Sequence, residues 1–134
     1  DENNKGLLFS SDFPYFRIKD PEKYIGCVVP DELKSKWRLY LDGDKNNLPK
    51  ILSEIDEIDL LHYDSDKTYS GREFSMKALS PYFNENTVVI MDDIQDNSFF
   101  YDYIVEEKIS DWKVIYFKGK YLGVIGLSNI FCNA

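Results

Sequence analysis

Two apolar, β-prone runs in this chain stop abruptly at carboxylates, the side chains best placed to do chemistry. The run 87–91 is followed directly by Asp92 and Asp93, and the run 58–63 is followed directly by Asp64. Carboxylates are excluded from a buried core, so each set must lie at the end of its strand. If the two strands are parallel neighbours, these acids meet at the carboxyl edge of the sheet, where open α/β sheets bind ligands.

Three roles are open to this acidic group, to which Asp66 also belongs. Carboxylates are the ligands that Mg²⁺ and Ca²⁺ prefer, and no cysteine and histidine set competes for zinc. The candidate metal ligands are Asp64, Asp92 and Asp93. One carboxylate could instead act as a general base, and Asp64 and Asp92 are the catalytic candidates. The acids could also cap the following helices and face water.

Other polar residues near these runs have both a chemical and a structural interpretation. Asp12 ends a short apolar run, where an acid commonly holds the two ribose hydroxyls of a nucleoside, but it could equally cap a turn. His62 is the only histidine, and its position inside a strand favours a core residue over a catalytic one. Lys67 and Arg72 could neutralise the acidic edge or meet an anionic substrate, or they could be solvated charges at a helix start.

Strand and helix patterns alternate along the chain, which predicts an α/β fold. The expected strands are 6–12, 37–41, 58–63 and 87–91, followed by an antiparallel hairpin of 112–117 and 121–127 around Lys118–Lys120. The expected helices are a short one at 30–36, one with Leu48, Ile51, Leu52 and Ile55 on its apolar side, one after Tyr69 with Phe74, Ala78 and Leu79 on that side, and one over 99–104. Such alternation predicts a mostly parallel, Rossmann-like sheet with helices on both faces.

The bulk properties narrow the choice of partners. A chain of 134 residues predicts one domain over 1–134, and its net charge of -8 without a basic patch argues against nucleic acid. No apolar run approaches the ~20 residues that cross a bilayer, so a membrane partner is not expected. Cys27 and Cys132 lack metal-type spacing and suit a reduced, cytoplasmic setting. A small-molecule substrate is the expected partner.

Several motifs match one family when they are taken together. The specific ones are 59–72 (DLLHYDSDKTYSGR) and 91–97 (MDDIQDN), and weaker ones are 9–12 (FSSD), 39–44 (LYLDGD) and 119–124 (GKYLGV). Together they resemble class I S-adenosylmethionine-dependent methyltransferases. The nearest branch contains macrocin O-methyltransferase-like and cephalosporin hydroxylase-like proteins. The resemblance covers nearly the whole chain.

This resemblance implies a function and a set of roles. The reaction would be O-methylation of a small polar or sugar-like substrate with S-adenosylmethionine as cofactor. Asp12 would bind the cofactor ribose, and Asp44 would lie near the adenine. Asp64, Asp92 and Asp93 would fall where metal-dependent members hold Mg²⁺ or another divalent cation, which orients the substrate hydroxyls and lowers the pKa of the one to be methylated. Members commonly carry histidine where Lys67 stands, so a role tied to that histidine does not transfer.

The resemblance also leaves a gap at the start of the chain. The family's first strand and glycine-rich loop should precede Gly6 and are absent from the sequence. We therefore expect a C-terminal portion of a methyltransferase, incomplete at the N-terminus, that binds cofactor poorly or not at all by itself. A second copy of the chain is a candidate partner, because it could lend a strand.

Two other classes of protein share some of these sequence features. The alternative is a non-catalytic, truncated α/β module for interaction or assembly. A phosphorylated receiver domain also has a strand that ends in two acids, but there the acidic pair ends the first strand. Here only a helix and a hairpin follow Asp93, so the receiver domain is discounted.

Overall fold

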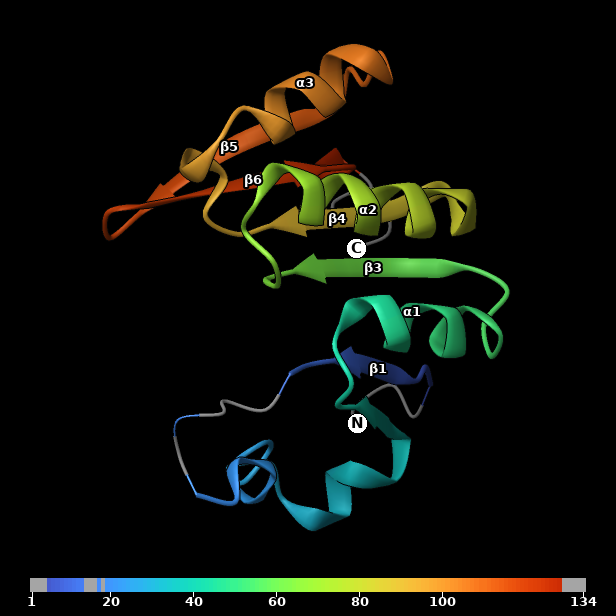
Figure 1. Cartoon of the computed structure of the whole chain (residues 1–134). Coiled ribbons are helices and arrows are strands. Elements are labelled where there is room, and N and C mark those ends of the chain that lie inside the picture. Colours follow the sequence, from blue (N-terminus) through green and yellow to red (C-terminus); the bar gives the residue numbers. More distant parts are fainter. Residues whose placement is uncertain (1–4, 14–16, 18, 129–134) are drawn as a thin grey trace. The chain divides into compact units, whose positions relative to one another are not determined.

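The computed structural model describes residues 5–13, 17 and 19–128, and the chain divides into two compact units, Asp1–Glu54 and Ile55–Ala134. Figure 1 labels the elements along the chain. Each unit contains its own β-sheet, of two strands in unit 1 and four strands in unit 2. One domain over residues 1–134 remains a prediction about how the two units assemble.

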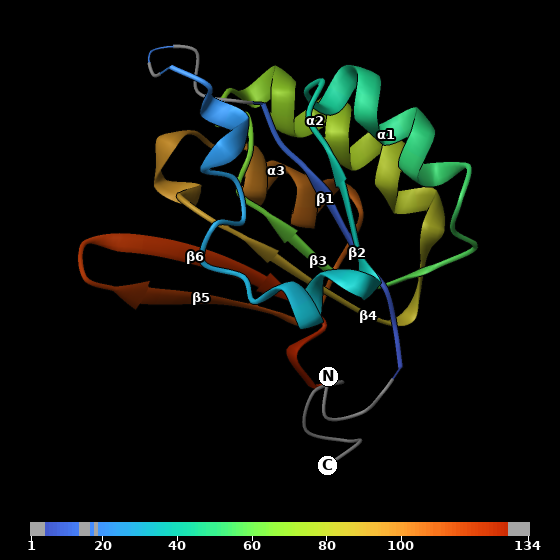
Figure 2. The ribbon, with the colours of Figure 1, turned by 90° about the horizontal axis from the view of Figure 1, so that it is seen from below.

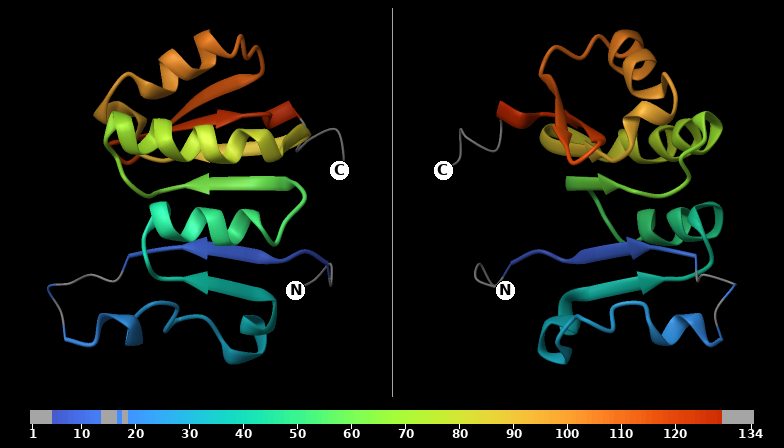
Figure 3. Two further views of the ribbon diagram at one scale, coloured as in Figure 1. Left: turned by 45° about the vertical axis from the view of Figure 1, so that its right-hand side comes forward. Right: turned by 90° about the vertical axis from the view of Figure 1, so that its left-hand side faces the viewer.

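Unit 1 is built around a pair of parallel strands. β1 (Leu8–Ser11) pairs with β2 (Trp37–Tyr40), and Figure 3 shows the two side by side. The connection between them contains two 3₁₀ helices, η1 (Pro21–Lys23) and η2 (Asp31–Lys36). The strand expected at 6–12 is therefore shorter than predicted, and it is not buried, since Leu8 is 59% exposed.

The helix α1 (Asp44–Leu52) completes unit 1. Its buried side consists of Asn47, Leu48 and Ile51, so the apolar spacing predicted the correct face. The helix starts earlier than expected, which puts Pro49 inside it rather than in its first turn, and it ends before Ile55.

Unit 2 contains a mixed sheet with the order β3-β4-β6-β5. Its strands are β3 (Ile58–Tyr63), β4 (Phe83–Met91), β5 (Trp112–Phe117) and β6 (Lys120–Ile125). β3 and β4 are parallel neighbours, as predicted, whereas β6 pairs antiparallel with both β4 and β5. The carboxyl-terminal half of β4 is the buried centre of this sheet, with Val88, Val89 and Met91 less than a tenth exposed.

Two helices, α2 (Tyr69–Leu79) and α3 (Phe99–Glu106), lie over the same face of this sheet (Figure 2). The short helices η3 (Ser80–Tyr82) and η4 (Ile94–Asp96) belong to the turns that flank β4. Helices on both faces were expected, and within the described part of unit 2 this is not what is found. The physical reason is that the crossovers from β3 to β4 and from β4 to β5 progress in the same direction, and crossovers of one hand then place both helices on one side.

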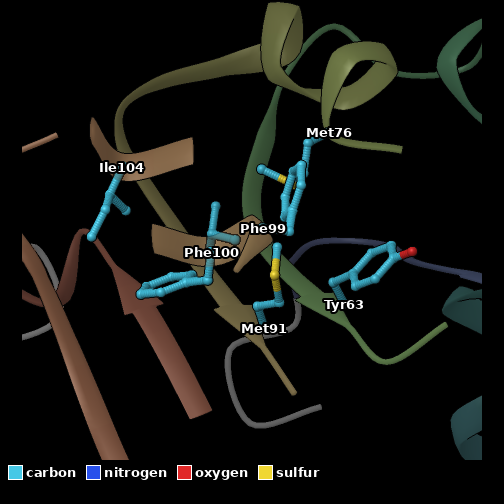
Figure 4. Packing of buried hydrophobic residues seen from close by; sticks show 7 residues of the cluster. Tyr63, Met76, Met91, Phe99, Phe100 and Ile104 are labelled. Atoms are coloured by element: carbon cyan, nitrogen blue, oxygen red, sulfur yellow. The ribbon is translucent and has the colours of Figure 1, made fainter. Parts of the chain in front are cut away.

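The core of unit 2 lies between this face and its helices (Figure 4). It is formed by Tyr63, Met76, Val89, Met91, Phe99, Phe100 and Ile104. α2 buries Leu79, as predicted, but the rest of its buried side differs from the prediction, because Phe74 is 39% exposed while Arg72 and Met76 are buried.

The hairpin of β5 and β6 forms as predicted, with a tight turn at Lys118 and Gly119. Both residues have positive φ, 48° and 87°, which is typical of the two-residue turn that matches the twist of paired strands. All six residues of β5 are exposed. In the described ranges no helix has the length and apolar character that crossing a membrane requires. Cys27 is a free, exposed thiol, and Cys132 lies outside the described residues.

Candidate functional site

The carboxyl ends of β3 and β4 are aligned by their register. Tyr63 and Met91 are paired across the two strands, and both are buried, at 4% and 0% exposure. The backbone N–H of Asp92 donates to the Tyr63 carbonyl at 3.0 Å, which continues the pairing for one more residue. Because the two buried residues are level, Asp64 and Asp92 both emerge at the same edge of the sheet.

This edge brings three of the four predicted carboxylates together. Asp64, Asp92 and Asp93 each offer an oxygen atom within 4.8 Å of the other two. Asp66 has a different role, because its Oδ1 accepts a hydrogen bond from the Thr68 N–H at 2.9 Å ahead of α2. The N-cap of α2 is Thr68, whose side chain accepts from the Gly71 N–H, so Asp66 supports the capping residue and is not the cap itself.

Two lysines share these three carboxylates. The Lys67 ammonium pairs with Asp64 and lies 3.0 Å from Asp93 Oδ2 and 3.7 Å from Asp92 Oδ2. The Lys120 ammonium lies 3.2 Å from Asp93 Oδ2 and 3.5 Å from Asp92 Oδ2. We call these five residues the acid–lysine cluster. Its three negative and two positive charges leave a net charge of -1.

The cluster alters the pKa of its members. Hydrogen bonds from Lys67, and then from Gln95, lower the pKa of the Asp93 carboxyl to about 2. Burial lowers the pKa of Lys67, but its hydrogen bonds to Asp64 and Asp93 outweigh burial and raise it. Hydrogen bonding to Asp93 and the charge of Asp92 also raise the pKa of Lys120. At neutral pH both lysines and Asp93 are therefore fully charged.

A buried arginine holds the turn that carries Asp92 and Asp93. Arg72, on α2, has no exposed surface, and its Nη2 donates to the Asp92 and Asp93 carbonyls at 3.2 and 2.8 Å. Its Nη1 donates to Asn97 Oδ1 at 3.3 Å, and Asn97 Nδ2 donates to the Lys67 carbonyl at 2.8 Å. One network of side chains thus links α2 to both loops of the site. The prediction of a solvated charge or substrate contact at Arg72 was wrong.

Gln95, in η4, holds the Asp93 carboxylate and connects it to the hairpin. Gln95 donates from Nε2 to Asp93 Oδ1 at 3.1 Å and accepts from the Tyr121 N–H at 3.0 Å. Gln95, Asn97 and Lys120 were not predicted as site residues, because nothing in their local pattern indicates which side chains they contact. Of the alternatives left open for Lys67, its ion pairs with the three carboxylates agree with neutralisation of the acidic edge.

The acid–lysine cluster has only some of the features of a site for a divalent cation. Three converging carboxylates are the oxygen ligands that Mg²⁺ or Ca²⁺ prefers. However, two ammonium groups within 3.0 to 3.7 Å already share the oxygens of Asp92 and Asp93. A metal would have to displace both, so the arrangement fits an ion-paired cluster better than a metal site. Metal binding by these residues stays a prediction.

The two predicted cofactor residues lie in unit 1. Asp12 follows β1, is exposed, and accepts the Phe13 N–H on its own Oδ1 at 2.7 Å. Asp44 begins α1 and accepts from Ser11 Oγ at 2.6 Å. The fully buried Asn47 links the ends of β1 and β2, because its Nδ2 lies within hydrogen-bond distance of Ser11 Oγ, the Asp12 carbonyl and the Tyr40 carbonyl. Asn47 was missed because its spacing is that of an ordinary helix residue.

The prediction that His62 belongs to the core is wrong. His62 is exposed on β3 rather than part of the core. The buried residues of β3 and its neighbours face α2 and α3, and His62 lies in the strand position next to the buried Tyr63, so its side chain belongs to the opposite face.

Comparison with solved structures shows the fold. The chain is similar to CalS11, a TDP-rhamnose 3′-O-methyltransferase of calicheamicin biosynthesis in its apo structure, with a TM-score of 0.64 at 14% sequence identity. The match covers 89% of this chain and 58% of that protein, so the chain spans little more than half the neighbour's length. No protein-family model and no curated protein sequence matches the chain. The chain therefore has a methyltransferase-like α/β fold.

Proposed function

We propose that this chain is part of an S-adenosylmethionine-dependent methyltransferase that methylates an oxygen of a small polar or sugar-like substrate. The observation that carries the proposal is the convergence of Asp64, Asp92 and Asp93 at the carboxyl ends of β3 and β4. Ligands bind at such an edge in open α/β sheets. The fold likeness to a sugar O-methyltransferase supports the same reaction class.

Asp92 is the carboxylate best suited to receive the acceptor's proton. Asp93 is held by Lys67, Lys120 and Gln95, and Asp64 is paired with Lys67, whereas Asp92 lies 3.5 and 3.7 Å from the two ammonium groups. S-adenosylmethionine supplies an electrophilic methyl group. Asp92 would take the hydroxyl proton of the acceptor as the acceptor oxygen receives that methyl group. Asp64 would orient the acceptor.

The cofactor residues of the proposal are Asp12, toward the ribose hydroxyls, and Asp44, toward the adenine. Asp12 is exposed at the end of β1 and has one further carboxylate oxygen besides the one bound to the Phe13 N–H. Among the described strands, β3 pairs with β4 alone. We infer that its other edge receives the first strand that the resemblance expects, which would also bring the glycine-rich loop for the methionine end of the cofactor.

The test has a binding part and a catalytic part. Calorimetry with S-adenosylhomocysteine should detect no micromolar binding to the present chain and should detect it once the encoded sequence ahead of Asp1 is included. That longer protein should transfer labelled methyl groups from S-adenosylmethionine to a nucleotide sugar. Asp92→Asn should lower this rate by about 100-fold or more, because a general base is lost.

The control is Asp59→Asn, which changes an exposed aspartate elsewhere on β3 and should leave the rate unchanged. A folded longer protein that neither binds S-adenosylhomocysteine nor transfers methyl groups would overturn the proposal. That result would favour the alternative interpretation, a non-catalytic α/β module.

A further inference from the structure

The acid–lysine cluster carries its own positive charges. The ammonium groups of Lys67 and Lys120 each lie within 3.7 Å of both Asp92 and Asp93. The position where a divalent cation would meet the three carboxylates is therefore already contacted by two cations that belong to the chain. These lysines are fixed parts of the site only if their backbones are held in place by other contacts.

The backbone around both lysines is anchored. The Lys67 carbonyl accepts from Asn97 Nδ2 at 2.8 Å, and the side chain of Lys67 is only 30% exposed. Its partner Asp64 lies three residues earlier in the same loop, so this ion pair is local in sequence. Lys120 is the first residue of β6 and is paired with Phe117 across the tight turn, and the next N–H, that of Tyr121, donates to Gln95. Two independent elements thus deliver ammonium groups to the same oxygens.

We propose that Lys67 and Lys120 are the counter-ions of Asp64, Asp92 and Asp93, and that Lys67 takes the place of a divalent cation in this site. A metal ion can enter only by separating these ion pairs and would then lie close to two positive charges, which repel it. The wild-type chain consequently binds divalent cations weakly. Removing the Lys67 charge exposes a three-carboxylate site of the type that Mg²⁺, Mn²⁺ and Ca²⁺ prefer.

This inference deepens the proposed function and rests on it for its chemical meaning. An ammonium group beside the acceptor can donate a hydrogen bond to the oxygen and stabilise its developing negative charge, which is the service that a bound cation would otherwise supply. The occupancy of the cluster is measured without any methyl transfer. Failure of the metal-binding result and failure of the methyltransferase proposal are therefore separate outcomes.

The experiment is a calorimetric titration of the present chain with MnCl₂, repeated with MgCl₂. Wild type should show a dissociation constant weaker than about 1 mM, and Lys67→Met should bind at least tenfold more tightly, because one of two repelling charges is gone. Lys67→Met with Lys120→Met should bind more tightly still. Adding Asp93→Asn to Lys67→Met should abolish the gain. Circular dichroism checks the fold, and Lys67→Gln replaces Lys67→Met if that variant does not fold.

Lys77→Met is the matched control. It removes one positive charge from α2, where Lys77 pairs with Glu73 away from the cluster, and it should bind Mn²⁺ as weakly as wild type. Micromolar, stoichiometric Mn²⁺ binding by wild type would overturn the proposal. So would a Lys67 variant that gains no more affinity than Lys77→Met.

Discussion

At the level of single residues, the site depends on how Asp93 is held. Asp93 has φ 50° and ψ 44°, a left-handed conformation that is uncommon for residues other than glycine and that aspartate tolerates better than most. The carbonyl of Asp93 is bound by Arg72, and its carboxylate is bound by Lys67, Lys120 and Gln95. This turn directs Asp92 and Asp93 to the same two lysines.

The pKa of Asp93 gives a prediction about pH. It lies at about 2 in the folded chain, against roughly 3.9 for an unperturbed aspartate. Because the folded value is the lower one, the ion pairs stabilise the fold above about pH 4, and this stabilisation is lost as the pH falls from about 4 to 2. A carboxyl NMR titration with EDTA present should show Asp93 titrating near 2 in wild type.

Lys67→Met should raise the Asp93 pKa toward its ordinary value, since the largest cause of the shift is the hydrogen bond from Lys67. The Lys77→Met variant should leave it unchanged. Titration of the wild-type Asp93 at its ordinary value would contradict the geometry of the cluster.

At the level of elements, α2 is the support on which the site is built. Its side 72, 75, 76 and 79 is buried, and this set combines an arginine and a serine with two apolar residues. Of the two polar residues on this buried side, Arg72 has a clear structural role. Arg72 crosses from α2 to the end of β4 and satisfies two backbone carbonyls there, which the strand pairing does not reach.

Arg72→Met should therefore destabilise the chain by about 3 kcal/mol, because the buried carbonyls of Asp92 and Asp93 lose their charged donor. Urea unfolding followed by circular dichroism measures this difference. Lys77→Met on the same helix should change the unfolding free energy by less than about 1 kcal/mol, since it breaks only an exposed pair with Glu73. Equal stability of the two variants would show that Arg72 does not hold the turn.

At the level of the whole molecule, the two units differ in how much they bury. Among the described residues, unit 1 has a two-stranded sheet and one α-helix, whereas unit 2 has a four-stranded sheet, two α-helices and the aromatic and methionine core. Two-stranded sheets are marginal by themselves, while a central strand with neighbours on both sides is protected. The residues proposed for the cofactor lie in unit 1, and those proposed for the acceptor lie in unit 2.

Hydrogen–deuterium exchange read by mass spectrometry should show this difference. Peptides that contain the carboxyl-terminal half of β4 should exchange most slowly, because this half is buried and paired with both β3 and β6. Peptides that contain β1 or β2 should exchange faster. Equal protection of β1 and β4 would mean that unit 1 is stabilised by something its own sheet and helix do not provide.

The sequence by itself determined the elements and the edge at which chemistry can occur. Apolar runs that stop at Asp64 and Asp92 require those residues to leave the core, and parallel pairing of β3 with β4 then brings them together. These are local consequences of burial and alternation, so they can be derived without coordinates. The turn at Lys118 and Gly119 was predictable for the same reason.

Only the tertiary structure decided what surrounds the acids. Lys120 reaches Asp93 because β6 inserts between β4 and β5, a pairing that local pattern does not specify. Arg72 looks like a surface charge in sequence and becomes a buried clamp because distant carbonyls of β4 need a donor. An acidic edge in the sequence thus becomes an ion-paired cluster in the fold, since long-range contacts decide which charges meet.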